Sequence, residues 1–391
     1  MYKIGLQNIQ YPEIRNIVDK IQDARYYKYV EKQSSLERII NKIMGLLKLK
    51  KRTIKKRYSY EDVFKPKYDK NLDFFHLFNS VSSGKNDWGV TFETVVPLFE
   101  EKKLGVFLKG QILIFDNEKD IKKVNKPECK FLIAISECTY NLQIEYLNYF
   151  PIYKDNILRK MYVLHPPQKI LMEIYEKPSI EDVVNFMFVG KEFLSKGGIE
   201  ILNVFNHIKD TYPNFTLTLI GSLEKNQNSR CFVNDVELIE LKNVIKYNEK
   251  RITYYESLPN DQLMKLMLEK IHVGMLPTHA DTYGYSLLEF QSAGCPVIST
   301  NCRALSEINN EECGWLIDVP QSNLGEPYAN TESELIFIQK TIEEQLCKIM
   351  VEILNNPNSI ANKGMNSIKR IKENHDLGEF SKKLSNIYSN I

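Results

Sequence analysis

Two carboxylates flank a glycine-containing turn in the segment DTYGYSLLE, residues 281–289. Asp281 precedes the turn, and Glu289 falls one turn into a helix that is expected to begin near Ser286. Free N–H groups at a helix start attract an anion, and each carboxylate can accept hydrogen bonds from two vicinal hydroxyls. The segment therefore predicts a nucleotide-sugar pocket. The alternative is that Ser286 and Glu289 form a capping box, with Asp281 an ordinary turn residue.

A second signal is the sequence GKEFLSKG, residues 190–197, which follows an apolar run. Gly190 permits a sharp turn and a close backbone approach. Lys191 and Lys196 lie ahead of an expected helix N-terminus, a combination that suits a pyrophosphate. The alternative is a solvated strand-to-helix loop that carries ordinary surface lysines.

The second half of the chain contains several further segments that occur in a family order. They are FVGKEFLSKGG, FTLTLIGS, RITYYES, the D-x7-E segment followed by SAGCPVIST, and ALSEI…ECGWLI. Together they resemble the donor-binding half of the family 4 glycosyltransferases of GT-B fold, over residues 183–320. IAISECTYNLQIEYL and KMYVLHPP are similar to the last strand, helix and linker of that family's first domain.

This resemblance implies roles for the residues above. Lys191 and Lys196 would hold the pyrophosphate. Glu289 would hold the ribose, and Asp281, where the family has Glu, the donor-sugar hydroxyls. Backbone N–H groups of residues 283–287 would hold the distal phosphate, and the base would lie against Ser257 and Leu258. The residues expected to bind the donor besides the charged ones are Gly190, Ser257, Leu258, Thr282, Tyr283, Gly284, Tyr285, Ser286 and Leu287.

The first half departs from the family pattern. Leu6 is followed by Gln-Asn-Ile rather than by a glycine-rich loop. Glu93 stands where the family often has a His that contacts the donor sugar. Glu93, His76 and His279 are the candidates for the acceptor side, since His76 ends a strand before a small-residue loop and His279 lies two residues before Asp281.

The cysteines, histidines and acidic residues give no metal-binding pattern. The seven cysteines include no C-x-x-C pair, the six histidines lack ligand spacing, and there is no D-x-D motif. We therefore expect no metal and no cofactor other than the nucleotide diphospho-sugar substrate. The odd cysteine count also argues against a disulfide framework and favours a reducing cytosol.

Alternating apolar and amphipathic segments must position these residues. In the second half, strands are expected at 183–189, 215–220, 251–256, 271–276, 296–300 and 315–317, and helices at 198–209, 234–247, 261–270, 285–293 and 304–308. This alternation predicts a parallel, doubly wound sheet with helices on both faces. In the first half, strands are expected at 3–6, 74–78, 88–92, 111–115, 131–135 and 161–164, with a long polar helical region over about 13–57.

The predicted fold is α/β: two facing Rossmann-like domains of the GT-B type with a cleft between them. The expected domains are residues 1–167 on the acceptor side and 183–378 on the donor side, joined by a linker at 168–182. The resemblance implies that a final helix at 379–388 packs back on the first domain. Open parallel sheets bind ligands at the carboxyl ends of their strands, so the cleft is the expected site.

Charge and hydropathy limit the possible partners. The 391 residues include 52 Lys and Arg against 50 Asp and Glu, a net charge of +2, which argues against a nucleic-acid binder. No signal-peptide pattern or membrane-spanning run is expected. Residues 36–57 combine one apolar helical stripe with nine basic residues and one acid, which suits an anionic membrane surface. The alternative packs that stripe on the first domain.

These observations lead to one main functional prediction and two alternatives. The main prediction is a retaining glycosyltransferase that moves a sugar from a nucleotide diphospho-sugar to a glycan or lipid-linked acceptor. We expect a cytoplasmic enzyme of bacterial surface polysaccharide biosynthesis, either free or peripheral on the inner face of the cell membrane. The alternatives are a nucleotide-sugar 2-epimerase of GT-B fold and a non-catalytic nucleotide-sugar-binding scaffold subunit.

Overall fold

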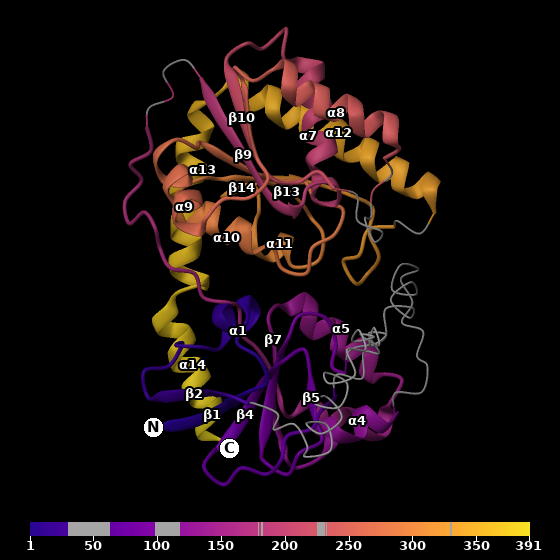
Figure 1. Cartoon of the computed structure of the whole chain (residues 1–391), viewed down its shortest axis with the longest axis vertical. Coiled ribbons are helices and arrows are strands. Elements are labelled where there is room, and N and C mark those ends of the chain that lie inside the picture. Colours follow the sequence, from indigo (N-terminus) through magenta and orange to yellow (C-terminus); the bar gives the residue numbers. More distant parts are fainter. Residues whose placement is uncertain are drawn as a thin grey trace, which may run out of the picture.

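The computed structural model describes residues 1–29, 63–97, 118–178, 180, 183–224, 231, 233–328 and 331–391. These residues form two six-stranded sheets, one from each half of the chain, and a separate two-stranded pair. Every strand pair within the two large sheets is parallel. Figure 1 shows the two sheets in separate halves of the molecule, with both chain termini in the same half.

The first sheet has the strand order β2-β1-β4-β6-β7-β8. Its strands are β1 (Tyr2–Leu6), β2 (Ala24–Lys28), β4 (Phe74–Phe78), β6 (Trp88–Phe92), β7 (Cys129–Ala134) and β8 (Met161–Val163). The short strands β3 (Val63–Phe64) and β5 (Val81–Ser82) pair with each other. The helices of this half are α1 (Tyr11–Asn16), α4 (Glu118–Asn125), α5 (Glu137–Leu147) and α6 (Pro151–Leu158).

The second sheet has the order β11-β10-β9-β12-β13-β14. Its strands are β9 (Val184–Glu192), β10 (Phe215–Ser222), β11 (Ile252–Tyr255), β12 (Val273–Leu276), β13 (Val297–Thr300) and β14 (Gly314–Ile317). A π-helical turn, η2 (Leu194–Gly198), leads into α7 (Ile199–Ile208). The other helices are α8 (Asp235–Tyr247), α9 (Asn260–Glu269), α10 (Tyr285–Ser292), α11 (Leu305–Ile308), α12 (Glu332–Asn355), α13 (Asn358–Asn374) and α14 (Leu377–Ser389).

Both faces of the first sheet are covered, so neighbouring residues of one strand enter different cores. In β4, Phe75 belongs to one buried cluster and Phe74 to the other. Four side chains of α14, namely Phe380, Leu384, Ile387 and Tyr388, complete the second cluster beside β1. The last helix of the chain thus packs on the first sheet, beside β1 and β2 in Figure 1.

The carboxyl ends of the two sheets face each other across the domain interface. Glu307 of α11 accepts hydrogen bonds from the backbone N–H groups of Glu137 and Cys138, at 2.8 and 2.7 Å. Those two N–H groups lie at the start of α5, directly after β7. A carboxylate at a helix N-terminus is favoured by the unpaired N–H groups there, and here the Glu307 carboxylate links the two halves.

Among the described residues, no helix is long and apolar enough to cross a bilayer.

The observed elements match the expected ones closely in the second half and less well in the first. The expected helical region over about 13–57 is wrong at its start, because α1 ends at Asn16 and β2 follows at Ala24–Lys28. β2 is an edge strand with largely exposed side chains, so its sequence ARYYK lacks the apolar run of a buried strand. The expected strand at 111–115 and the basic segment 36–57 lie outside the described residues.

Candidate active site

Lys196 and Asp281 meet at the carboxyl edge of the second sheet. Lys196 lies in η2, and its Nζ is 2.8 Å from Asp281 Oδ2 and 2.7 Å from the carbonyl oxygen of Ala280. The neighbouring Gly197 has φ +96°, and a Cβ there would come within 2.2 Å of the Pro277 carbonyl oxygen. Only glycine fits this position, so the backbone brings the lysine loop against the loop that follows β12.

The second oxygen of Asp281 shapes the turn. Asp281 Oδ1 accepts hydrogen bonds from the N–H groups of Tyr283 at 3.1 Å and Gly284 at 2.9 Å. Burial raises the pKa of Asp281, but the Lys196 ammonium and these N–H groups together lower it by more, so the pKa lies below its ordinary value. Asp281 is therefore ionised at neutral pH, and it acts as a turn residue as well as the partner of Lys196.

Helix α10 begins at Tyr285 without a side-chain cap. Gly284 is its N-cap, in a left-handed conformation with φ +86°, and makes no side-chain cap hydrogen bond. Within the described residues, the N–H groups of Tyr285 and Ser286 therefore remain available for an anion. Fewer N–H groups are free for a phosphate than the five expected at residues 283–287. Asp281 accepts hydrogen bonds from two of them, and the N–H of Leu287 donates to the Gly284 carbonyl oxygen.

The capping-box alternative is wrong for Ser286 and Glu289. Ser286 is the second residue of α10 rather than its N-cap, so the Ser286 side chain cannot close a box with Glu289. Glu289 is instead buried, with 9% of it exposed, and faces the other half of the molecule. Burial raises the pKa of Glu289, and the charge of Arg15 opposes that effect.

Arg15 of α1 is the main contact that the sequence reasoning missed. Its Nη1 lies 3.9 Å from Glu289 Oε1, and its guanidinium carbon lies 4.9 Å from the centre of the Tyr285 ring. The next residue, Asn16, donates a hydrogen bond from Nδ2 to the Tyr285 hydroxyl at 2.9 Å. No motif in the sequence predicts this contact, because Arg15 falls within the expected helical region over about 13–57 and belongs to no ligand-binding pattern.

Glu93 lies at the carboxyl end of β6, on the side of the first sheet that faces the Lys196 loop. Its Oε1 accepts a hydrogen bond from Asn79 Nδ2 at 3.1 Å, and its carbonyl oxygen accepts one from Arg303 Nη2 at 2.8 Å. Burial raises the pKa of Glu93. Glu93 and Asn79 line a hollow of about 340 Å³ that Gln7, Asn8 and Ser80 also border. The structure thus gives this acceptor-side candidate a cavity.

The two histidine candidates do not reach the interface. His76 is 1% exposed, and its Nδ1 lies 2.6 Å from the hydroxyl of Tyr388 on α14. His279 is also 1% exposed, and its Nε2 lies 2.6 Å from Glu200 Oε1. Burial lowers the pKa of His76 to about 3, so that imidazole is neutral. The prediction that they lie on the acceptor side is therefore wrong for both histidines, because each side chain is buried and packs behind its strand end.

The remaining predicted donor residues lie on neighbouring loops. Lys191 is exposed near the end of β9, whereas Thr282 is half-buried in the turn before α10. A Cβ at Gly190 would come within 2.9 Å of Lys196 Cβ, so this glycine lets Lys196 pass close to the strand. Ser257 is exposed and Leu258 partly buried in the loop after β11. Their roles toward the base and the pyrophosphate remain predictions.

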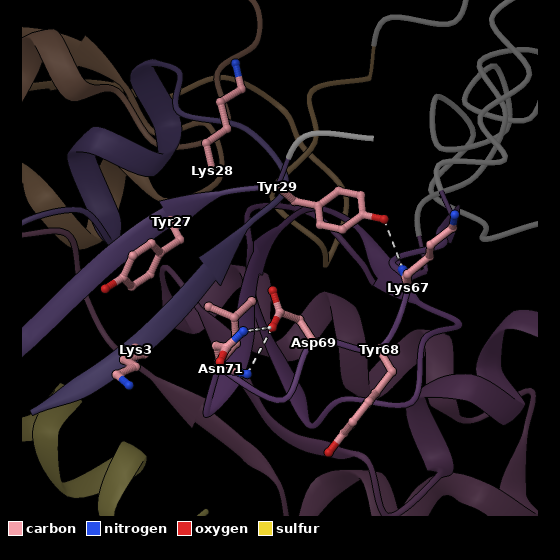
Figure 2. A pocket seen from close by; sticks show the side chains of 9 residues that line it. Lys3, Tyr27, Lys28, Tyr29, Lys67, Tyr68, Asp69 and Asn71 are labelled. Atoms are coloured by element: carbon pink, nitrogen blue, oxygen red, sulfur yellow. Dashed lines mark hydrogen bonds between the residues drawn. The ribbon is translucent and has the colours of Figure 1, made fainter. Parts of the chain in front are cut away.

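A separate hollow of about 590 Å³ opens on the first sheet (Figure 2). It is lined by Lys3, Tyr27, Lys28, Tyr29, Lys67, Tyr68, Asp69, Asn71 and Leu72. Tyr29 closes one side by accepting a hydrogen bond from the Lys67 N–H, and Asp69 Oδ1 accepts two from Asn71. None of the predicted donor or acceptor residues lines this hollow, so it is distinct from the site at the domain interface.

Comparisons with known proteins agree with this architecture. Residues 173–325 match the family "Glycosyl transferases group 1". Anabaena HepE in complex with UDP has 12% identity and a TM-score of 0.58, with 100% of both chains covered. The glycosyltransferase from Rickettsia africae ESF-5 has 14% identity and a TM-score of 0.53, covering 94% of this chain and 84% of that one.

Not all similar structures are matched over their whole length. TarM has 12% identity and a TM-score of 0.50, with 81% of this chain covered but only 54% of TarM, so the chain spans about half of that protein. No curated protein sequence matches the chain. The two facing parallel sheets and the site between them define the GT-B class. The resemblance to GT-B glycosyltransferases is confirmed. The part of the chain that matches the group 1 glycosyl transferases in sequence is residues 173–325.

Proposed function

We propose that the protein is a retaining glycosyltransferase. It transfers a sugar from a nucleotide diphospho-sugar to a hydroxyl of a glycan or lipid-linked glycan. The observation that carries this proposal is the grouping of Lys196, Asp281 and Glu289 around the uncapped start of α10, opposite the carboxyl edge of the first sheet. A cation and a helix N-terminus suit a pyrophosphate, and the two carboxylates suit the hydroxyls of the ribose and the sugar on either side of it.

The positions of these groups suit stabilisation of a departing diphosphate. As the bond between the anomeric carbon and the phosphate oxygen breaks, negative charge grows on that oxygen. Lys196 and the Tyr285 and Ser286 N–H groups are fixed donors for this charge, which lowers the barrier without reorganisation. The acceptor hydroxyl forms the new bond on the same face, and its proton passes to the leaving phosphate. No protein nucleophile is required.

The hollow beside Glu93 is the proposed acceptor side. The described residues around it are Gln7, Asn8, Val63, Phe78, Asn79, Ser80, Val81, Glu93, Pro97 and Asp120. Amide, hydroxyl and carboxylate groups there can exchange hydrogen bonds with sugar hydroxyls. The Asp120 carboxylate is paired with Lys123 of the same helix. The Glu93 carboxylate lies near enough to Asp281 and Lys196 for their charges to act on its pKa, which suits a contact at the reacting end of either substrate.

The proposed setting is bacterial surface polysaccharide biosynthesis, on the cytoplasmic side and without a metal requirement. UDP is the first donor nucleotide to test, because the HepE complexes and the pneumococcal O-GlcNAc transferase GtfA complex carry UDP. Lys196 can neutralise part of the pyrophosphate charge that a divalent cation would otherwise neutralise.

Incubation with radiolabelled UDP-glucose and UDP-GlcNAc, with and without a bacterial lipid extract, tests the proposal. Label in a glycan or lipid fraction, or released sugar with retained configuration, supports it. An isomerised donor would instead indicate a 2-epimerase, and binding without turnover a scaffold subunit. Parallel reactions with EDTA, then with added Mg²⁺ or Mn²⁺, test metal independence: activity lost to EDTA and restored by either ion would contradict it.

A further inference from the structure

Helix α1 of the first half presents one face to helix α10 of the second half. Tyr11 and Arg15 are four residues apart on α1, and Tyr285 and Glu289 are four apart on α10. Residues with this spacing lie on the same side of a helix. The Tyr11 and Tyr285 rings meet edge-to-face with centroids 5.8 Å apart, and Arg15 lies against both Tyr285 and Glu289. The contact between the two halves is thus centred on the proposed ribose carboxylate.

Arg15 is held in place from a third direction. Its Nη2 donates a hydrogen bond to Gln168 Oε1 at 2.8 Å, in the connection between the two halves. Gln168 is fixed in turn, since its N–H donates to the His375 carbonyl oxygen and its Nε2 donates to Ser292 on α10. The guanidinium is planar and already hydrogen-bonded to Gln168, so it loses little further conformational entropy when its other N–H groups bind a partner.

Glu289 must stay ionised to accept hydrogen bonds from two ribose hydroxyls at full strength, because a protonated carboxyl becomes a donor and a weaker acceptor. Burial works against ionisation by raising the pKa of Glu289. The groups that face Glu289 are Arg15 and Tyr11 of α1. Burial raises the pKa of Tyr11 to about 12, so the phenol stays neutral.

Other charged groups lie near Arg15, since its charge acts on Lys20 and Arg370 acts with it on His375, but among the described residues Arg15 is the one whose charge acts on Glu289. On α10 itself, burial raises the pKa of Tyr285, as it does that of Tyr11, so this phenol is neutral too. Gln168 is uncharged. His375, which lies beyond Gln168, has its pKa lowered by burial to about 4 and is neutral above that pH. Arg15 is therefore the charged group that opposes protonation of Glu289.

We propose that Arg15 is a positioning residue for the donor ribose. From the opposite half of the molecule it keeps Glu289 charged and correctly placed, so the ribose subsite is complete only when α1 and α10 are in contact. This inference rests on the proposed function for the identity of the ligand. It adds that one side of the donor subsite belongs to the first half of the chain.

The first test needs no ligand. The side-chain carboxyl of Glu289 is titrated by NMR in protein labelled with ¹³C-glutamate, with Glu289→Gln identifying the signal. The titration midpoint is expected to move to higher pH in Arg15→Gln and to return toward the wild-type value in Arg15→Lys. Arg25→Gln is the matched control, because it removes the same charge from an exposed position on β2. A midpoint unchanged in Arg15→Gln overturns the proposal.

The second test uses UDP and 2′,3′-dideoxy-UDP at pH 8 and pH 6. The two ligands carry the same titrating diphosphate, so the ratio of their affinities isolates the ribose hydroxyls. In wild type this ratio is expected to stay constant. In Arg15→Gln the advantage of UDP is expected to be smaller at pH 6 than at pH 8, because a larger share of the Glu289 carboxyl is protonated and no longer an anionic acceptor for the ribose hydroxyls.

The outcomes separate this inference from the proposed function. Equal weakening of both ligands at both pH values would show a merely structural Arg15 and overturn the inference. Wild-type protein that binds neither ligand, nor ADP or GDP, would overturn the proposed donor function together with the ribose assignment. In that case the carboxyl titration still decides whether Arg15 controls the charge of Glu289.

Discussion

Lys196 and Asp281 form a direct ion pair, 2.8 Å from Nζ to Oδ2, although the sequence assigns them to different parts of the donor. Their side chains are only 24% and 16% exposed. The pair therefore holds two groups in adjacent positions, the cation proposed to bind the pyrophosphate and the carboxylate proposed to bind the sugar. A pyrophosphate that enters this site must share Lys196 with Asp281.

Replacement of Lys196 by Ala is expected to weaken binding of the free nucleoside diphosphate and of the intact nucleotide sugar to the same extent. The pyrophosphate is common to both, and a charge-assisted hydrogen bond contributes about 1.5–3 kcal/mol, so each affinity should fall at least about tenfold. Calorimetric titration with both ligands measures the effect. Lys250→Ala, at an exposed position before β11, is the control and should change neither affinity.

Asp281→Asn is expected to weaken binding of the nucleotide sugar without weakening binding of the free nucleoside diphosphate. The Asn side chain keeps an oxygen for the Tyr283 and Gly284 N–H groups, so the turn should survive. The charge that accepts the sugar hydroxyls is lost, and affinity for the nucleotide sugar should fall while that for the free diphosphate is spared. Asp281→Ala, which also removes the turn hydrogen bonds, should lower the melting temperature. Equal loss of both ligands in Asp281→Asn would contradict the sugar role.

Glu289→Gln is expected to weaken every nucleotide ligand at least about tenfold, because two ribose hydroxyls lose a charged acceptor. The fold should survive, since Gln matches Glu in shape and Ser286 does not use Glu289 as a cap. Titration calorimetry with UDP, alongside a thermal melt, gives both quantities. Unchanged affinity in a folded variant would remove the main support for a donor site on α10.

His76 is expected to make the protein less stable in mild acid. Burial lowers the pKa of His76 to about 3 in the folded protein, against 6.5 as the ordinary value, so only the unfolded chain takes up a proton between these values. Stability contributed by the neutral side chain is present above about pH 6.5 and is lost as the pH falls. From pH 7 to pH 5 the loss should be about 2 kcal/mol larger in wild type than in His76→Gln. Urea unfolding at both pH values measures it, and the exposed His207→Gln is the control that should follow wild type.

Residues 36–57 are expected to contribute to membrane association, from nine basic residues and one apolar stripe. Changing Lys50, Lys51, Arg52, Lys55 and Lys56 to Glu should reduce sedimentation with vesicles that contain anionic phosphatidylglycerol. Neutral phosphatidylcholine vesicles serve as the reference. If the variant and wild type sediment alike with anionic vesicles, the segment packs on the protein or is solvated instead.

Parallel sheets explain why the second half was readable from its sequence. Strands such as β12 (Val273–Leu276) are buried on both faces, and such strands have nearly continuous apolar sequences. Loops that bind charged ligands follow these runs directly. The sequence therefore places Lys196 and Asp281 on loops after strands and Glu289 near the start of a helix.

The first half gave weaker local signals. The edge strand β2 is mostly exposed, and α1 has only six residues, so neither produced a clear period. Even a correct assignment of α1 would not have shown what Arg15 contacts. Within one segment the sequence determines which side chains share a face, because that depends on local geometry.

Contacts between distant segments depend on how the two sheets pack. Glu289 is 274 positions along the chain from Arg15, and His76 is 312 from its partner Tyr388. The same residue types at the same spacings would fit an exposed arginine and a histidine open to the cleft. The sequence alone therefore determined the α/β fold class, through apolar runs, and the positions of the candidate donor-side residues on the loops between them. Only the packing of α1 on α10, and of α14 on the first sheet, decided which of the other polar groups are buried and what each one binds.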